Sequence, residues 1–206
     1  MKKLLLAVFL LLPTAVCVQA AQDLKPNWGL NDITGQNRTV TDSSNQNNPL
    51  AIVGAGSLED GSVTNSSLTI DGVSVSINSQ TAADQAYAHT SATQGAYVAG
   101  GAVFNNTAAG NTLNISNTTL TGRDAYGGAA NLKYTADRFG AGSANNNVVN
   151  INNVTTNAYT FTPSAGGGSV NLGGNVYGGY SKYAKGTANG NTVNVSNGST
   201  INGNVY

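Results

Sequence analysis

A ten-residue pattern recurs three times in this chain and constrains its fold more than any other feature. The pattern reads Ala-x-x-Asn-x-(Leu/Val)-Asn-(Ile/Val)-(Ser/Asn)-Asn, and its copies span residues 108–117, 144–153 and 188–197. A second element, a Gly-Gly pair flanked by small or aromatic residues, recurs at 98–102, 125–129 and 176–180. Self-similarity at this scale indicates a stacked repeat, in which each unit buries its apolar face against its neighbours.

Alternation of apolar and polar residues within each copy predicts a half-buried β-strand. Stacking the copies, about 4.8 Å apart, predicts a parallel β-helix with two inward columns. The columns are Leu113, Val149 and Val193, and then Ile115, Ile151 and Val195. A degenerate earlier copy carries Leu68 and Ile70 at the same alternation.

Asparagines fall into two classes by their position in the repeat. The first class points inward and predicts a ladder of amides that hydrogen-bond from copy to copy, although turn asparagines are an alternative; its members are Asn111, Asn147 and Asn191. The second class follows the strands and suits corners with left-handed backbone; its members are Asn117, Asn153 and Asn197. The Gly-Gly pairs are expected where rungs or bends approach closely.

The first twenty residues have the form of a secretory signal peptide. Lys2 and Lys3 precede an apolar run that is too short to cross a bilayer, and a small-x-small cleavage site ends at Ala20. Removal of residues 1–20 leaves a cysteine-free chain with a slight acidic excess and no basic run. Nucleic acid is therefore not an expected partner. We assign 21–49 to an irregular leader or cap and 50–206 to the repeats.

Three insertions interrupt the repeats, around residues 79–94, 131–139 and 156–168. Insertions into a stacked repeat leave the core and become surface loops, often on the binding face. Aromatic rings in such loops can cover the C–H surfaces of sugars, although they can equally cover the ends of rungs. The candidate ligand-contacting residues are Tyr134, Phe139, Tyr159 and Phe161.

Catalytic chemistry finds little support in the sequence. The single histidine, His89, lacks the sequence context of a catalytic triad, and no run of Asp, His or Cys has metal-ligand spacing. Arg123-Asp124 and Asp137-Arg138 are interpreted as exposed ion pairs. We therefore predict no catalytic, cofactor or metal site. A β-helix carbohydrate-active enzyme would have to draw its acids from Glu59, Asp60, Asp124 and Asp137.

The combination of a signal peptide, cysteine-free Asn/Gly/Ser/Thr-rich repeats, Asn-Thr-Val-Asn-Val-Ser at 191–196 and Gly-Asn-Val-Tyr-Gly-Gly-Tyr at 174–180 resembles bacterial autotransporter passengers of type V secretion. The resemblance covers about 50–206. It implies a right-handed parallel β-helix (β-solenoid) at the cell surface, in the outer membrane or outside the cell. It also implies a non-enzymatic role in adhesion, aggregation or biofilm formation, with host surfaces, glycans or sister cells as partners.

The sequence departs from that family after the repeats. Residues 203–206 duplicate 174–177 and then stop, and no β-barrel pattern follows. We therefore expect a fragment, periplasmic if it truly lacks a barrel, with an open C-terminal strand edge that can self-associate. A spacer or a non-functional fragment of a longer autotransporter is the remaining alternative.

Overall fold

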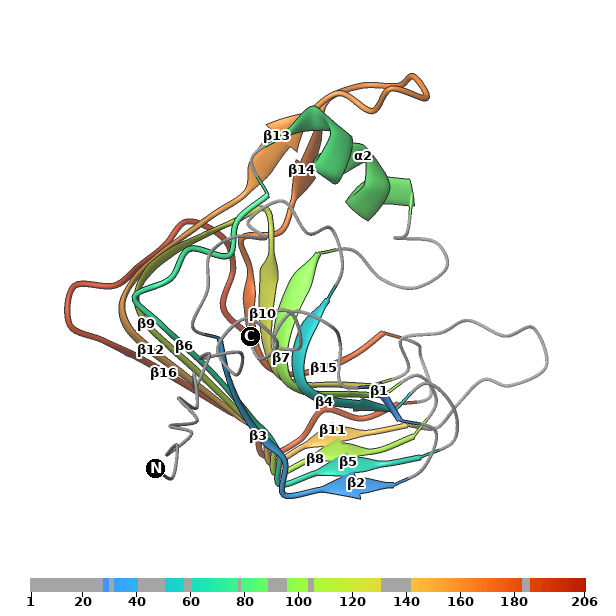
Figure 1. The fold of residues 1–206 in the computed structure, drawn as a ribbon, viewed down its shortest axis with the longest axis vertical. Coiled ribbons are helices and arrows are strands. Elements are labelled where there is room, and N and C mark those ends of the chain that lie inside the picture. The colour runs from blue at the N-terminus through green and yellow to red at the C-terminus, as the bar shows by residue number, and fades with distance from the viewer. Residues whose placement is uncertain are drawn as a thin grey trace, which may run out of the picture.

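The structure is a computed structural model that describes residues 28–29, 32–40, 51–57, 61–77, 79–88, 96–103, 106–130, 142–182 and 186–206. These residues form an all-β fold with three parallel sheets, one antiparallel hairpin and one short helix. The three sheets surround a common interior, and the hairpin and helix project from one side (Figure 1). No helix in the described part of the chain has the length and apolar character that a membrane crossing requires.

Each parallel sheet collects one strand from successive passes of the chain. The first sheet has the order β1 (Trp28–Gly29), β4 (Ile52–Ser57), β7 (Tyr97–Val103), β10 (Asp124–Ala130), β15 (Val176–Ser181). The second has the order β11 (Ala144–Asn145), β8 (Ala108–Ala109), β5 (Val63–Thr64), β2 (Ile33–Thr34). The third has the order β16 (Thr192–Ser196), β12 (Val148–Asn157), β9 (Thr112–Thr121), β6 (Ser67–Asp71), β3 (Asn37–Val40), and β17 (Thr200–Ile201) also pairs with β12.

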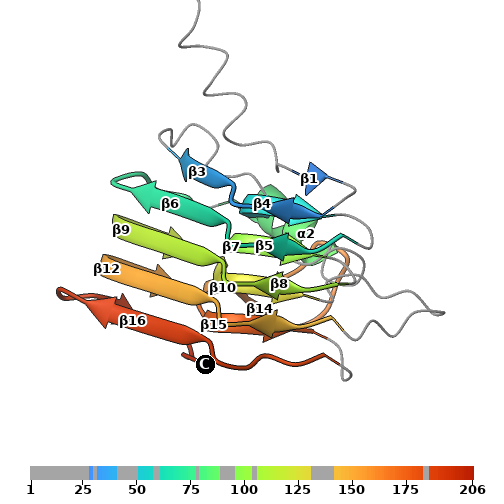
Figure 2. The same cartoon turned by 90° about the horizontal axis from the view of Figure 1, so that it is seen from below.

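The chain visits the three sheets in a fixed order. It runs through β4, β5 and β6, then β7, β8 and β9, then β10, β11 and β12, so neighbours in every sheet come from consecutive passes. Figure 2 shows these passes as layers stacked edge to edge. Equivalent residues of consecutive passes therefore lie beside one another, as the repeat in the sequence requires.

The two apolar columns are confirmed by the strand register. Leu68, Leu113, Val149 and Val193 are successive partners in the third sheet, as are Ile70, Ile115, Ile151 and Val195. All but the last copy are buried in one hydrophobic core. Val195 is 46% exposed, contrary to its predicted inward position, because β16 is the edge strand of the third sheet among the described residues.

The asparagine ladder is also confirmed, and the turn alternative for these residues is wrong. The backbone N–H and the Nδ2 of Asn111 both donate to Asn147 Oδ1, at 2.9 and 3.1 Å. Asn147 donates to Asn191 Oδ1 in the same way, at 2.9 and 3.1 Å. The corner asparagines likewise adopt left-handed backbone, with φ of 52°, 54° and 49° at Asn117, Asn153 and Asn197.

The Gly-Gly pairs give this ladder its space. A Cβ added to Gly101 would lie 2.5 Å from Asn111 Cγ, and Cβ atoms at Gly128 and Gly179 would overlap the side chains of Asn147 and Asn191 in the same way. Side chains at these positions would displace the amides. The Gly-Gly element and the asparagine of the ten-residue pattern therefore pack against each other in each copy.

The structure departs from the predicted boundaries at the N-terminal side. Strands β1, β2 and β3 lie within 21–49, which the sequence predicts to be an irregular leader or cap, and they pair in parallel with β4, β5 and β6. The sheets therefore begin before residue 50. Backbone pairing with the following pass orders this polar segment, although its sequence lacks the apolar alternation of the later copies. The signal peptide 1–20 lies outside the described residues.

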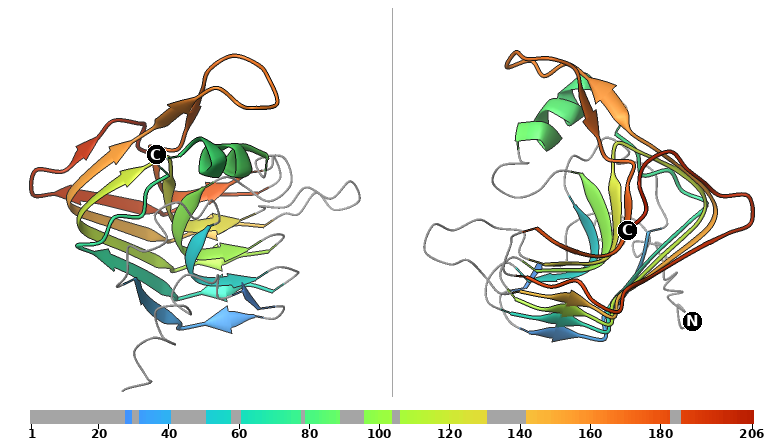
Figure 3. Two further views of the ribbon diagram at one scale, coloured as in Figure 1. Left: turned by 45° about the horizontal axis from the view of Figure 1, so that its top comes forward. Right: turned by 180° about the vertical axis from the view of Figure 1, so that it is seen from behind.

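Two of the three insertions are structured. Residues 79–94 include the helix α2 (Gln80–Ala88), and 156–168 lies largely in a hairpin formed by β13 (Tyr159–Phe161) and β14 (Val170–Leu172). Figure 3 shows the helix lying against this hairpin. Gln80 Nε2 donates to Thr162 O at 2.9 Å, and Ser164 N donates to Asp84 Oδ1 at 2.9 Å. The insertion at 131–139 lies outside the described residues.

Candidate functional site

A row of tyrosines covers the face of the first sheet that points away from the main core. Because strand residues alternate between faces, Val98, Ala125 and Val176 point into the core, while Ala99, Tyr126 and Tyr177 point to the opposite face. This second face forms its own hydrophobic cluster. The Gly-Gly element thus places aromatic rings from separate passes side by side.

The tyrosine rings contact one another from strand to strand. Tyr126 lies at the centre, with its ring centroid 5.3 Å from Tyr97, 5.1 Å from Tyr177 and 4.9 Å from Tyr180. The Tyr126 and Tyr180 rings are stacked at 12°. Each aromatic pair contributes about 0.5–1.5 kcal/mol beyond its burial. The rings are therefore held in fixed orientations before any ligand arrives.

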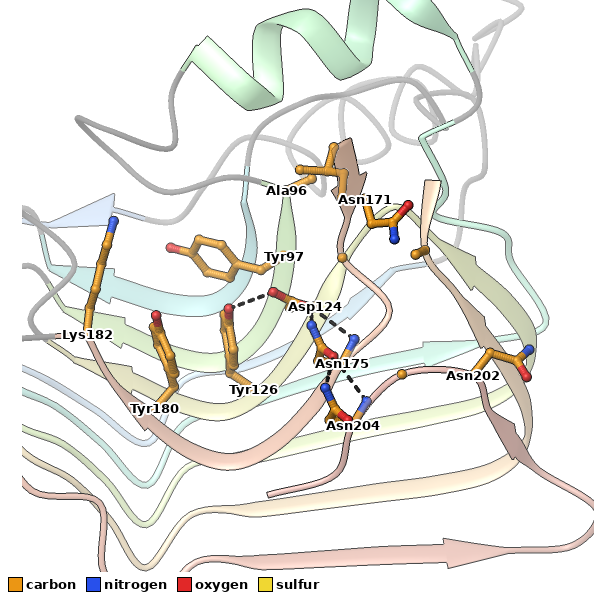
Figure 4. A pocket seen from close by; sticks show the side chains of 14 residues that line it. Ala96, Tyr97, Asp124, Tyr126, Asn171, Asn175, Tyr180, Lys182, Asn202 and Asn204 are labelled. Carbon is orange, nitrogen blue, oxygen red and sulfur yellow. Dashed lines mark hydrogen bonds between the residues drawn. The ribbon is translucent and has the colours of Figure 1, made fainter. Parts of the chain in front are cut away.

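A cleft of about 580 Å³ opens beside these rings, and we name it the tyrosine cleft. Tyr97, Tyr126, Tyr180 and Lys182 line one half of it (Figure 4). Side-chain amides line the other half; they belong to Asn171, Asn175, Asn202 and Asn204. Small-molecule sites usually measure about 300–1,000 Å³ and combine aromatic walls with a few polar groups. The tyrosine cleft has both properties.

Asp124 lies between the two halves and is held by three hydrogen bonds. Its Oδ1 accepts from the backbone N and the Nδ2 of Asn175, each at 3.0 Å, and its Oδ2 accepts from the Tyr126 hydroxyl at 3.1 Å. Burial raises the pKa of this carboxyl, and the hydrogen bonds from Asn175 and Tyr126 partly offset that rise. Both oxygens are thus committed to neighbouring side chains and backbone.

The predicted exposed ion pair of Arg123 and Asp124 is wrong. Arg123 is fully buried, and desolvation lowers the pKa of its guanidinium to about 10. Adjacent residues at the start of a strand point to opposite faces, so Arg123 enters the interior while Asp124 lines the tyrosine cleft. The second predicted pair, Asp137 and Arg138, lies outside the described residues.

The Tyr97 hydroxyl is a buried polar group inside this site. Tyr97 is 2% exposed, and its hydroxyl has no hydrogen-bond partner among the residues that the structure describes. Burial raises the pKa of this phenol, so it stays protonated across the physiological range. Tyr97 therefore lines the cleft while its hydroxyl is enclosed by the protein.

The two predicted ligand-contacting residues that the structure describes, Tyr159 and Phe161, do not line the tyrosine cleft. Phe161 is 5% exposed and packs with Tyr159 against Ile77 and alanines of α2, so its ring is closed to a ligand. Tyr159 is half-buried in the same cluster. Both rings thus anchor the hairpin to the helix, which favours the alternative that they cover the ends of rungs. Tyr134 and Phe139 lie outside the described residues.

Sequence reasoning missed the tyrosines that do line a cleft. Tyr126 and Tyr180 flank the Gly-Gly pairs of their copies, and Tyr97 immediately precedes the first such element. That recurrence of aromatic residues beside Gly-Gly was the available signal. Of the four acids considered for catalysis, Asp124 lies in the tyrosine cleft, and Glu59, Asp60 and Asp137 lie outside the described residues. The described residues contain no group of three potential metal ligands.

Comparison of the chain with protein-family models, curated proteins and solved structures finds no match. Arguments about function therefore rest on the repeats and on the tyrosine cleft.

Proposed function

We propose that this chain is a right-handed parallel β-helix of the autotransporter-passenger type. In this proposal it is exported through the inner membrane and acts at the cell surface, in the outer membrane or outside the cell. Its role is adhesion, aggregation or biofilm formation, with a host surface, a glycan or a sister cell as its partner. It performs this role by binding and without catalysis.

The path of the chain supports the β-helix. Three parallel sheets visited in a fixed order are the path of a coil, in which every turn adds one strand to each sheet. Matched residues are spaced unevenly along the chain, because Leu113 pairs with Val149 and Val149 with Val193 across insertions of different length. A coil tolerates such variation, since the extra residues leave at the corners.

The outward rows support binding through many weak contacts. Asn114, Asn150 and Asn194 form a row on the outside of the third sheet, with each Nδ2 of the later residue donating to the preceding Oδ1 at 2.8 Å. These bonds fix the amides and reduce the entropy lost when a ligand binds. A long face of fixed polar groups suits multivalent contact with a large surface.

The tyrosine cleft is the observation that carries the proposal. Its walls come from the repeats themselves, through Tyr126 of β10 and Tyr180 of β15, and its one acid among the described residues is Asp124. Glycoside hydrolysis usually needs two carboxyl groups, and both Asp124 oxygens already accept hydrogen bonds. A binding site is therefore favoured over a catalytic site, because the cleft has aromatic walls, several amides and a single carboxylate whose oxygens already accept hydrogen bonds.

A binding assay tests this function directly. The purified 206-residue chain, immobilised on beads, should bind host cells, sister cells or arrayed glycans saturably, and a thermally unfolded sample should lose that binding. Absence of binding in all three assays, together with no effect of the chain on bacterial aggregation, would contradict the proposal.

A carbohydrate-active enzyme of the β-helix type is the second candidate, and one observation favours it. Asp124 is an acid in a cleft with a pKa raised by burial, which is a property of general acids. An enzyme of this kind should release reducing or unsaturated ends from polysaccharides, and Asp124→Asn should abolish the release. Turnover that survives this substitution would remove Asp124 from the mechanism.

A further inference from the structure

We infer that the tyrosine cleft binds an uncharged glycan, with the face of a sugar ring against the tyrosine half and its hydroxyl edge against the amide half. This inference deepens the proposed function. It rests on that function in one respect, which is that the glycan belongs to the surface of another cell. It follows from the division of the cleft walls, from their charge and from the polar atoms that lack partners.

The division of the walls matches the two sides of a pyranose ring. Figure 4 shows Tyr97, Tyr126 and Tyr180 together on one side and Asn171 and Asn202 on the other. Ring faces pack against the C–H face of a sugar at little cost in side-chain entropy, whereas amides match hydroxyl pairs because they both donate and accept. A purely apolar ligand would leave the amide half unused.

The charges of the cleft favour a neutral ligand. Asp124 and Lys182 are the two charged side chains among the described residues that line it, so their formal charges cancel. Recognition of carboxylate, sulfate or phosphate usually relies on arginine pairs or clusters of cations. The fully buried Arg123 belongs to the interior and does not line the cleft. Sialylated, uronate-bearing and sulfated glycans are therefore disfavoured.

Polar atoms without partners point into this site. Within the described residues, Asn171 uses its Oδ1 to accept from Thr160 and Asn202 uses its Nδ2 to donate to Asn157. The Nδ2 of Asn171 and the Oδ1 of Asn202 remain for a ligand. A sugar hydroxyl can form a hydrogen bond with each of these two groups.

The remaining side chains hold the cleft in shape without a ligand. Asn204 donates its backbone N–H to Asn175 Oδ1 at 3.0 Å, and Asn175 donates to Asp124, which fixes the floor of the amide half. Tyr126 is fixed by Asp124 and by three ring contacts. A site prepared in this way loses little conformational entropy on binding.

The test uses the full chain and an array of oligosaccharides. The array carries neutral hexose and N-acetylhexosamine oligosaccharides beside sialylated, uronate-bearing and sulfated counterparts. The neutral members should bind, and calorimetric titration with the strongest of them gives the Kd of the wild type and of each variant. Thermal melting of every variant is measured in parallel.

Three tyrosine variants separate binding from folding. Tyr97→Phe keeps the ring wall and removes only the enclosed hydroxyl, so its affinity should match the wild type while its melting temperature stays the same or rises. Tyr180→Ala should weaken binding at least tenfold because it removes a ring wall. Tyr206→Ala is the matched control, since Tyr206 is 65% exposed, stacks on Tyr177 and does not line the cleft; its affinity should match the wild type.

Each contrary outcome has a distinct meaning. Preference for the acidic glycans, or unchanged affinity in Tyr180→Ala, overturns the inference, while the proposed function stands if the chain still adheres to cells. Binding of no glycan also overturns the inference. The proposed function fails with it only when adhesion to host and sister cells is absent as well.

Discussion

Replacing Asn147 with alanine should remove a large part of the stability of this fold. Asn147 Oδ1 accepts two hydrogen bonds from Asn111, and its Nδ2 donates to Ala108 O at 2.9 Å and to Asn191 Oδ1 at 3.1 Å. Alanine leaves the buried Asn111 N–H without its acceptor, at ~1–3 kcal/mol, and removes three further bonds at ~0.5–1.5 kcal/mol each. The sum is roughly 2.5–7.5 kcal/mol, against about 5–15 kcal/mol for a typical domain.

Urea unfolding followed by circular dichroism measures this loss, and a second asparagine provides the control. Asn150 also bonds to its counterparts in neighbouring passes, but on the outside of the third sheet, where water can replace the lost bonds. Asn150→Ala should therefore cost less than about 1 kcal/mol. If Asn147→Ala costs no more than Asn150→Ala, the inward ladder does not stabilise the protein in the way argued above.

Three further substitutions probe the packing and the electrostatics. Gly128→Ala should lower the melting temperature sharply, since the added Cβ would overlap the Asn147 amide. An unchanged melting curve would mean that the asparagine ladder can shift to make room for a methyl group. Because burial raises the pKa of Asp124, its negative charge is destabilising above that pKa. Asp124→Asn should then stabilise the protein most at neutral pH, and the gain should shrink as the pH falls through the Asp124 pKa; a gain that is independent of pH would exclude this cause. Phe161→Ala should release the hairpin, with about 3–5 kcal/mol of lost packing visible as faster hydrogen exchange in 80–88 and 159–172, and glycan affinity should fall because the hairpin carries Asn171 of the cleft wall.

The strand register could be predicted from the sequence because apolar and polar residues alternate within each copy and the copies repeat. Only one alignment of the copies buries all the apolar residues. A shift of one residue would turn Leu113 and Ile115 to solvent and Asn114 to the core, so the alternation decides which residues of each copy stack. The same reasoning predicted the Asn111 ladder. The helix α2 and the hairpin could not be predicted in this way, since their sequences occur once and have no counterpart against which to align.

The tyrosine cleft could not be predicted because it depends on three segments that meet only through the register of the first sheet. Tyr126 pairs with Tyr177 and Ala99, which places the Tyr97 and Tyr180 rings diagonally to either side. The insertion that forms the hairpin supplies the opposite wall through Asn171. Aromatic residues in the insertions were expected to bind because they interrupt the pattern, yet Phe161 uses its ring for packing.

The asparagine ladder also bears on how the gene for such a chain can change. Asn147 and Asn191 occupy the same place in their copies and meet the preceding copy through the same two bonds. Recombination that joins Asn146 to Asn191 would therefore seat Asn191 opposite Asn111 with the ladder chemistry intact. The same event would delete Tyr180 from the tyrosine half of the cleft, and Asn171 and Asn175 from the amide half. Length can thus vary by whole copies while the interior is conserved, whereas the binding surface is gained or lost in a single genetic step.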